Sequence, residues 1–185
     1  MNDAKPMDVI GLLGPLRRYA RSLTRNEALA DDLVQDTLVR AYERRGSFRS
    51  GGNLRGWLLA ILHNAFIDGR RRDAAETRRV RQAADLVDAD AAVPATQESH
   101  VRLRQIRAAF MALPEEQRAA LHLVAVEGLS YQAAAAALDI PVGTLTSRLA
   151  RARAALRAFE AGSDPDRSSE GRPRPQLRIV GGSDV

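Results

Sequence analysis

The stretch LSYQAAAAALDIPVGTLTSRLARAR (residues 129–153) predicts two short helices joined by a tight turn. Its five consecutive alanines favour a helix, because alanine has the highest helix propensity. Asp139 stands where such a turn needs a left-handed residue, a conformation that aspartate tolerates better than most side chains. Pro141 follows and suits the first turn of the next helix, which Leu145 and Leu149 can anchor. The pattern is typical of a helix-turn-helix unit.

The exposed faces of the second helix carry small, hydroxylated and basic residues. Small and hydroxylated residues at a helix N-terminus can enter the major groove of DNA without a clash, and arginines add phosphate affinity or bind guanine. The residues predicted to contact DNA are Val142, Gly143, Thr144, Thr146, Ser147, Arg148 and Arg151. Taken alone, the stretch also fits an alanine-rich helical hairpin with a solvated basic face, because helix-turn-helix patterns give false positives.

The composition of the 185-residue chain favours helices throughout. Hydrophobic residues make up 45% but aromatic residues only 4%, so any core is aliphatic and alanine-rich, which suits close-packed helices. The net charge of +5 is compatible with a polyanionic partner. There is no cysteine, and the three histidines show no ligand spacing, so no metal site and no cofactor is predicted. No stretch resembles a secretory signal or approaches the roughly 20 apolar residues of a membrane span, so we expect a cytoplasmic protein without membrane insertion.

Apolar residues recur at three- and four-residue steps in both halves of the chain, so the predicted fold class is all-α. Asn26 and Asn53 are predicted to cap the second and third helices. Between the two halves lies a stretch with four acidic residues and no lysine or arginine, which predicts a flexible acidic linker. The predicted organisation is two small helical domains, 8–81 and 101–160, joined by the linker 82–100 and followed by a disordered tail, 161–185.

Three segments, in this order along the chain, resemble parts of bacterial sigma factors. ADDLVQDTLVRAYERRGSF (residues 30–48) resembles the segment that docks on core RNA polymerase, and GWLLAILHNAFIDGRRR (residues 56–72) resembles the neighbouring promoter-melting helix. Residues 113–156, which contain the helix-turn-helix, resemble the domain that reads the minus-35 element. Two such domains and a short linker resemble the extracytoplasmic-function (ECF) sigma factors, the minimal group of this family.

The resemblance implies a transcription initiation factor that is not an enzyme. Its implied partners are core RNA polymerase, through the clamp helices of the largest subunit and the flap, and promoter DNA. It also implies an anti-sigma factor that holds the protein until it is needed, and a free protein that is monomeric. The residues implied for polymerase contact are Asp32, Leu33, Gln35, Asp36 and Arg40.

The resemblance also assigns a set of residues to the minus-10 element and its melting. Opening DNA costs on the order of 1–2 kcal/mol of stacking per step, so a captured base needs a compensating pocket. The implied residues are Phe48, Asn53, Asn64, Asp68, Arg70, Arg71 and Arg72. Phe48 and Trp57 also fit a simple core role, which we prefer for Trp57.

Other functions fit less of the sequence. A sigma mimic that titrates an anti-sigma factor shares the fold, but this chain keeps the basic recognition helix and has no room for a receiver domain. A helix-turn-helix repressor leaves the two N-terminal motifs unexplained. An enzyme is least expected, because no nucleophile–base pair or carboxylate–histidine cluster is visible.

Overall fold

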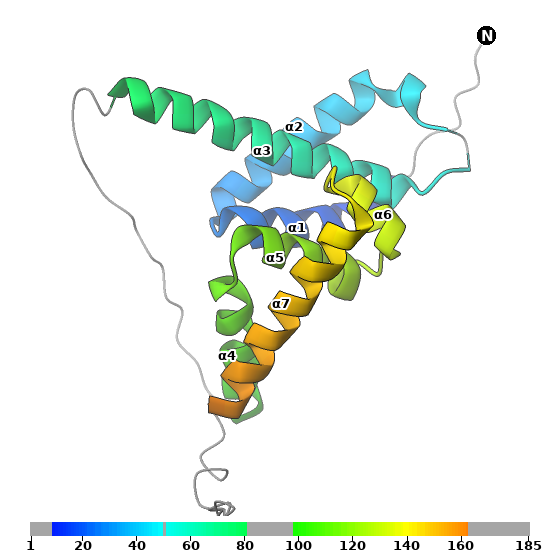
Figure 1. Cartoon of the computed structure of the whole chain (residues 1–185). Coiled ribbons are helices and arrows are strands. Elements are labelled where there is room, and N and C mark those ends of the chain that lie inside the picture. Colours follow the sequence, from blue (N-terminus) through cyan, green and yellow to red (C-terminus); the bar gives the residue numbers. More distant parts are fainter. Residues whose placement is uncertain (1–8, 50, 81–97, 163–185) are drawn as a thin grey trace, which may run out of the picture.

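The computed structural model describes residues 9–49, 51–80 and 98–162, and every regular element in these ranges is helical, which confirms the predicted class (Figure 1). The elements are η1 (Ile10–Leu12), α1 (Leu13–Thr24), α2 (Glu27–Glu43), η2 (Arg45–Ser47), α3 (Leu54–Val80), α4 (Glu98–Ala112), α5 (Glu115–Leu121), η3 (His122–Val126), α6 (Tyr131–Ala137) and α7 (Val142–Gly162). Helices α1 to α3 form an N-terminal domain, and α4 to α7 form a C-terminal domain. No helix in the described ranges is both long enough and apolar enough to cross a bilayer.

The N-terminal domain is a three-helix unit whose helix starts are fixed by asparagine caps. The Oδ1 atom of Asn26 accepts from the backbone N–H of Leu29 at 3.1 Å, and Oδ1 of Asn53 accepts from that of Gly56 at 3.0 Å. Both predicted caps are therefore confirmed. The core residues of the domain include Leu16, Tyr19, Leu23, Val34, Leu58, Leu59 and Leu62.

The C-terminal domain contains the predicted helix-turn-helix as α6 and α7. The Ser130 hydroxyl accepts from the N–H of Ala133 and caps α6, and Asp139 adopts the expected left-handed conformation with φ of 51°. Leu145 and Leu149 are buried and hold α7 in place, as predicted. Pro141 lies just before the first residue of α7 rather than inside its first turn.

Several boundaries differ from the prediction. Helix α4 begins at Glu98, three residues inside the predicted linker, and α7 continues to Gly162, two residues into the predicted tail. Residues 81–97 and 163–185, which hold most of the linker and the tail, lie outside the described residues.

The helix that follows Pro114 changes its winding after about two turns. Helix α5 ends at Leu121, and η3 continues as a π-helix in which the N–H of Glu127 donates to the carbonyl of His122 at 3.0 Å. A π-turn holds one more residue per turn than an α-helix, so it shifts the direction of the side chains that follow. No sequence pattern indicated this change of winding.

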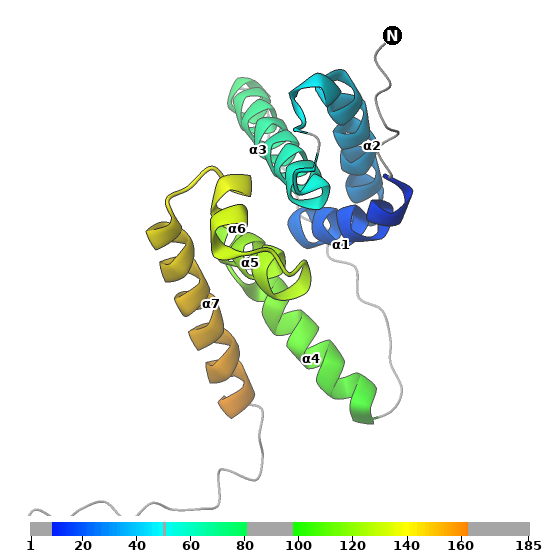
Figure 2. The same ribbon diagram turned by 90° about the vertical axis from the view of Figure 1, so that its right-hand side faces the viewer.

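The two domains pack directly on each other, which the sequence did not predict. Helix α1 contacts α5 and η3, and α3 contacts α6 (Figure 2). The buried hydrophobic residues of both domains form one continuous cluster. The described helices therefore form one compact unit in spite of the long linker between the domains.

A buried arginine, Arg118 of α5, joins the two domains through backbone carbonyls. Its Nε donates to the carbonyl of Ser22 in α1 at 2.5 Å, and its Nη1 donates to the carbonyls of Met111 and Leu113 at 3.2 and 2.6 Å. Arg25 adds a second bridge, from Nη2 to the carbonyl of Met111 at 2.7 Å. Burial, reinforced by Arg25, lowers the pKa of Arg118 below its ordinary value.

Two histidines near the domain contact are held neutral. Nδ1 of His63 lies 3.0 Å from the Tyr19 hydroxyl, and Nε2 of His122 lies 3.2 Å from Oε1 of Glu127. Burial lowers the pKa of each histidine to about 4, with Arg148 adding to the effect at His63. At His122 the carboxylate of Glu127 opposes the lowering.

Replacing Arg118 with methionine should lower the free energy of unfolding by about 3 kcal/mol, because the buried carbonyls of Ser22 and Leu113 lose their donor. Urea unfolding followed by circular dichroism measures this change. Arg107→Met, at an exposed position of α4, is the matched control and should change the free energy of unfolding by less than about 0.5 kcal/mol. Equal effects of the two substitutions would contradict the bridging role of Arg118.

The two histidines should make stability depend on pH in a defined direction. Their folded pKa of about 4 lies below the ordinary 6.5, so the unfolded chain binds more protons between these values. The stabilisation is complete above pH 6.5 and is lost as pH falls towards 4, by about 1–2 kcal/mol per histidine at pH 5. Urea unfolding at the high and low ends of this pH range should show a smaller loss of unfolding free energy for His63→Gln than for the wild type. An identical loss would exclude His63 as a source of the pH dependence.

Candidate nucleic-acid interface

The first two turns of α7 present most of the residues predicted to contact the minus-35 element. Val142 is 42% exposed, and Gly143 and Thr146 are also exposed. The Thr146 hydroxyl donates to the carbonyl of Val142 at 2.9 Å, and the Ser147 hydroxyl donates to that of Thr144 at 2.9 Å. Because these hydroxyl protons are used within the helix, the oxygens remain as acceptors for a base or a water.

The arginines of α7 differ in their surroundings. Arg151 is exposed and its Nη2 lies 3.4 Å from the Ser147 hydroxyl. Arg148 has a side chain only 19% exposed and forms an ion pair with Glu116 at 2.8 Å. Arg151 is thus presented for DNA contact, whereas Arg148 is occupied by an acidic residue of α5.

The residues assigned to the minus-10 element come from α3 and from the loop before it. Asn64, Asp68 and Arg72 follow one another at four-residue steps and are exposed, so they share one face of α3. Arg71 is also exposed, beside that face. Arg70 points elsewhere, because its Nη1 pairs with Glu115 of the C-terminal domain at 3.0 Å.

The loop before α3 is built around an aromatic pair. The rings of Phe48 and Trp57 lie 5.2 Å apart, and Trp57 packs against the core, which agrees with the core role preferred for it. Gly51 has φ of 84°, a conformation that favours glycine. The side chain of Asn53 is the cap of α3, so its Oδ1 has a structural partner in addition to the assigned DNA role.

The predicted polymerase-contacting residues lie on α2 beside the promoter face of α3. Asp32, Leu33 and Asp36 line a groove between these helices, together with Phe66 and Arg72. Gln35 is exposed on the same helix, and so are the apolar side chains of Leu29, Val39 and Tyr42. A mixed acidic and apolar helix face of this kind suits a protein partner.

An arginine links the two predicted surfaces. Nε of Arg40 pairs with Asp36 of its own helix at 3.0 Å, and its Nη1 pairs with Asp68 of α3 at 3.1 Å. The hydrogen bond that Arg40 donates to the carboxylate of Asp36 is the main cause that raises the pKa of Arg40. Asp36 and Arg40 are predicted to contact polymerase, and Asp68 is predicted to contact the minus-10 element. One chain of ion pairs therefore connects the two groups of predicted residues.

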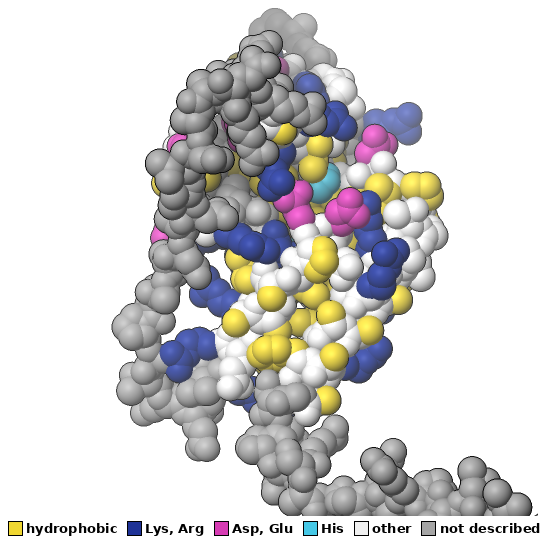
Figure 3. Space-filling view, turned by 60° about the vertical axis from the view of Figure 1, so that its left-hand side comes forward, with side chains coloured by type: hydrophobic (Ala, Val, Ile, Leu, Met, Phe, Trp, Pro, Cys, Tyr) yellow, Lys and Arg dark blue, Asp and Glu magenta, His cyan; other side chains and the backbone are white. Residues whose placement is uncertain are grey.

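Charged and apolar side chains are segregated on one face of the molecule. Figure 3 shows basic side chains over both domains and apolar side chains gathered over the lower helices of the C-terminal domain. The exposed large apolar residues of α4 and α7 are Leu103, Ile106, Val142 and Phe159. We found no group of metal-ligating residues within the described ranges.

The sequence reasoning missed the polar residues at the domain contact. Arg18, Arg55 and His122 converge on Glu127, which is fully buried. The available signal was a lone carboxylate at the end of the apolar run LHLVAVEGL (residues 121–129). Because buried carboxylates are rare unless paired, such a residue indicates a hidden partner.

Comparisons with known proteins agree with this geometry. The family model described as Sigma-70 region 2 matches residues 11–76, and that described as Sigma-70, region 4 matches residues 103–156. The chain is 40% identical, over 86% of each chain, to the ECF RNA polymerase sigma factor EcfG of Rhodopseudomonas palustris (strain TIE-1).

Two solved structures share the fold. One is the sigma factor RpoE in complex with the anti-sigma factor NepR from Bartonella quintana, with a TM-score of 0.71, 33% identity and coverage of 84% of this chain and 96% of that one. The other is CnrH in complex with the cytosolic domain of CnrY, with a TM-score of 0.57, 29% identity and coverage of 84% and 86%.

A helical domain of region 2 type followed by a region 4 domain with a helix-turn-helix defines a sigma factor, a non-enzymatic protein that directs transcription initiation at promoters. The sequence identity and coverage shared with the ECF sigma factor EcfG place the chain in a narrower group of sigma factors. The chain belongs to the ECF RNA polymerase sigma factor family.

Replacing Arg40 tests whether its ion pairs with Asp36 and Asp68 hold α2 and α3 together. Arg40→Met should lower the free energy of unfolding by about 1 kcal/mol, a modest value because Asp36 and Asp68 are partly exposed. In a double-mutant cycle with Asp68→Asn, the coupling should account for about half of that loss. Arg44→Met, at an exposed position one turn further along the chain, is the control. A coupling energy of zero between Arg40 and Asp68 would contradict the ion pair between α2 and α3.

Proposed function

We propose that the protein initiates transcription through three surfaces of defined composition. Helix α2 docks on core RNA polymerase, α3 and its preceding loop bind the melted minus-10 element, and the start of α7 reads the minus-35 element. The observation that carries this proposal is the joint exposure of the α7 N-terminus and of the Asn64–Arg72 face of α3 on one chain. The protein would work in the cytoplasm, as a monomer when free.

The α7 surface suits base reading in the major groove. Val142, Gly143 and Thr146 leave room for close approach, and the hydroxyl oxygens of Thr146 and Ser147 accept hydrogen bonds. Arg151 supplies a cation for phosphate or guanine. Thr144 is half-buried and would position the helix, while Arg148 would contribute only after it leaves Glu116.

The α3 surface suits single-stranded DNA. Asn64 offers an amide that can both donate to and accept from a base edge, and Arg71 and Arg72 offer cations for the backbone. The Phe48 ring closes the loop end of this face against Trp57. Asp68 would act mainly through Arg40, which it holds in place.

The α2 surface suits the clamp helices of the largest polymerase subunit. Asp32, Gln35 and Asp36 can make polar contacts, while Leu33 is half-buried and shapes the groove beside them. Arg40 completes the set through Asp36. The exposed apolar residues Leu103, Ile106 and Phe159 of the C-terminal domain are candidates for contact with the polymerase flap.

An anti-sigma factor is the proposed regulator. The solved structures of RpoE with NepR and of CnrH with CnrY are complexes of this kind. Their similarity to this chain supports a partner of the same class here. Such a partner would compete for the polymerase- and DNA-facing surfaces of α2, α3 and α7.

Transcription with purified components tests the proposal. The protein, added to core RNA polymerase and DNA fragments carrying its mapped promoters, should produce transcripts with defined start points. Arg151→Ala should lower initiation about tenfold, as the loss of one base or phosphate contact implies. Arg157→Ala, at an exposed position further along α7, is the control and should change initiation less than about twofold.

The outcome also separates this function from a sigma mimic. A mimic would bind an anti-sigma factor and yield no transcript with any promoter. The absence of specific starts with an active core polymerase would therefore contradict the proposal.

A further inference from the structure

The two polar atoms of the Asn53 side chain have different surroundings. Oδ1 accepts a hydrogen bond from the backbone N–H of Gly56 at 3.0 Å and caps α3. A backbone N–H can only donate, so the amide oxygen must face it, and this fixes the orientation of the amide. The side chain is exposed, and within the described ranges no acceptor takes a hydrogen bond from its Nδ2. Asn53 therefore offers a donor that the fold itself does not use.

Gly56 determines where this donor lies. A Cβ atom at Gly56 would approach Nδ2 of Asn53 to 3.0 Å and Cγ to 3.2 Å, and its three nearest neighbours all belong to Asn53. These distances are shorter than an ordinary van der Waals contact, so a larger side chain would displace the amide. Glycine in a helix costs stability relative to alanine, so helix formation does not explain its presence here. The space that Gly56 leaves is occupied by the Asn53 amide.

The loop before Asn53 is held by close packing. A Cβ atom at Gly52 would lie 3.0 Å from the carbonyl oxygen of Arg49 and 3.5 Å from Cε2 of Phe48, so the backbone lies against this ring. The same ring lies 5.2 Å from that of Trp57 in α3. The amide is thus fixed by its cap and by the packed loop, and a donor that is already in place loses little entropy when it binds.

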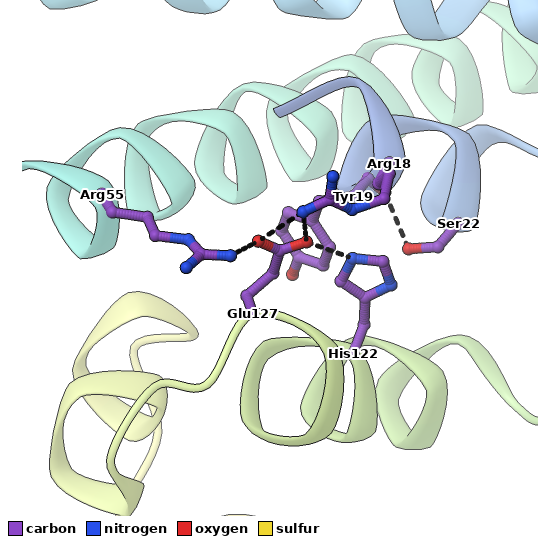
Figure 4. Close-up of polar contacts among 6 residues, drawn as sticks. All are labelled: Arg18, Tyr19, Ser22, Arg55, His122 and Glu127. Carbon is purple, nitrogen blue, oxygen red and sulfur yellow. Dashed lines mark hydrogen bonds and ion pairs between the residues drawn. The ribbon is translucent and has the colours of Figure 1, made fainter. Parts of the chain in front are cut away.

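The arginine nearest to Asn53 in the sequence is turned to another partner. Arg55 contacts the carboxylate of Glu127 through Nη2, and its side chain points into the contact with the C-terminal domain (Figure 4). The predicted promoter cations Arg71 and Arg72 lie about five turns further along α3. Asn53 therefore supplies an uncharged donor at the start of this helix.

An uncharged amide suits a base better than a phosphate. Arginines attract the DNA backbone through their charge, whereas asparagine side chains commonly bind base edges. Oδ1 of Asn53 is engaged by the cap, so the paired hydrogen bonds that a free asparagine makes to adenine are not available here. The amide can instead donate one hydrogen bond from Nδ2 to a carbonyl oxygen or a ring nitrogen of a base.

We propose that Asn53 has a double role, in which Oδ1 caps α3 while Nδ2 donates to an acceptor on one unpaired base of the minus-10 element. Gly56 is the positioning residue that keeps Nδ2 available for this bond. The inference rests on the proposed function, because the melted strand must first bring the base to the loop. The two roles use different atoms of one side chain, so they can be removed separately.

Binding of single-stranded DNA to the holoenzyme measures this bond. Core RNA polymerase carrying the full chain is titrated against a fluorescent oligonucleotide with the minus-10 non-template strand of a mapped promoter, and binding is followed by anisotropy. Serine caps helices as well as asparagine but has no amide, so Asn53→Ser should leave the melting temperature nearly unchanged. The same variant should bind the strand about fivefold more weakly, as expected for one lost hydrogen bond.

Strands with one abasic site, placed at each minus-10 position in turn, identify the base. At one position the abasic site should reduce the difference between Asn53→Ser and the wild type to less than about twofold, because the acceptor is already absent. At the other positions the difference should persist. A full difference on every strand would mean that Asn53 binds the backbone and would overturn the base contact. Equal binding of the intact strand by both proteins would overturn it as well.

Gly56→Ala tests the positioning separately. Alanine has the higher helix propensity, so this variant should melt at the wild-type temperature or above. It should nevertheless bind the intact strand about threefold more weakly and lose this difference at the same abasic position. Gly14→Ala, in the first turn of α1, is the matched control, because a Cβ atom there would lie 3.6 Å from Nη1 of Arg18, an ordinary contact. Wild-type binding by Gly56→Ala would overturn the positioning role.

Failure of this inference is distinguishable from failure of the proposed function. A wild-type holoenzyme that bound none of these strands would overturn the proposed function and the inference with it. A wild-type holoenzyme that bound the intact strand, with no change on substitution of Asn53 or Gly56, would overturn the inference alone.

Discussion

The burial of charge between the two domains is the constraint that governs the whole arrangement. Glu127 and Arg118 are each almost fully covered, and each finds essential partners across the contact. A buried charge without a partner is costly, so only domain orientations that satisfy both groups are compatible with the fold. The apolar cluster supplies the attraction between the domains, and the charges decide which faces meet.

Ion pairs at the surface also connect the helices that carry the predicted polymerase and promoter residues. The chain Asp36–Arg40–Asp68 ties α2 to α3, and Arg70 ties α3 to α5. A partner that moves α2 or α3 therefore acts on ion pairs that extend into the C-terminal domain.

The sequence predicted the features that depend on neighbouring residues. The caps at Asn26, Asn53 and Ser130, the left-handed Asp139 and the order of the helices all follow from local chemistry, and the structure confirms them. The family assignment was also available from three ordered motifs. The assigned DNA and polymerase residues lie on helices α2, α3 and α7 or in the loop before α3, and their roles remain predictions.

What the sequence could not predict depends on residues far apart in the chain. Arg18 and Glu127 are separated by 109 positions, and Arg118 and Ser22 by 96, so no spacing pattern links them. The ion pairs of Arg148 with Glu116 and of Arg70 with Glu115 could not be predicted from the sequence for the same reason.

The π-turn of η3 has a consequence in genetic terms. A π-turn is an α-helical turn with one inserted residue, and each residue of an α-helix turns the chain by about 100°. A deletion of a single codon within His122–Val126 would restore the α-helical register and rotate Glu127 away from Arg18 and Arg55. The ion pairs of Glu127 with the N-terminal domain therefore depend on the length of this one turn, and the deletion would remove them without changing any residue predicted to bind DNA or polymerase.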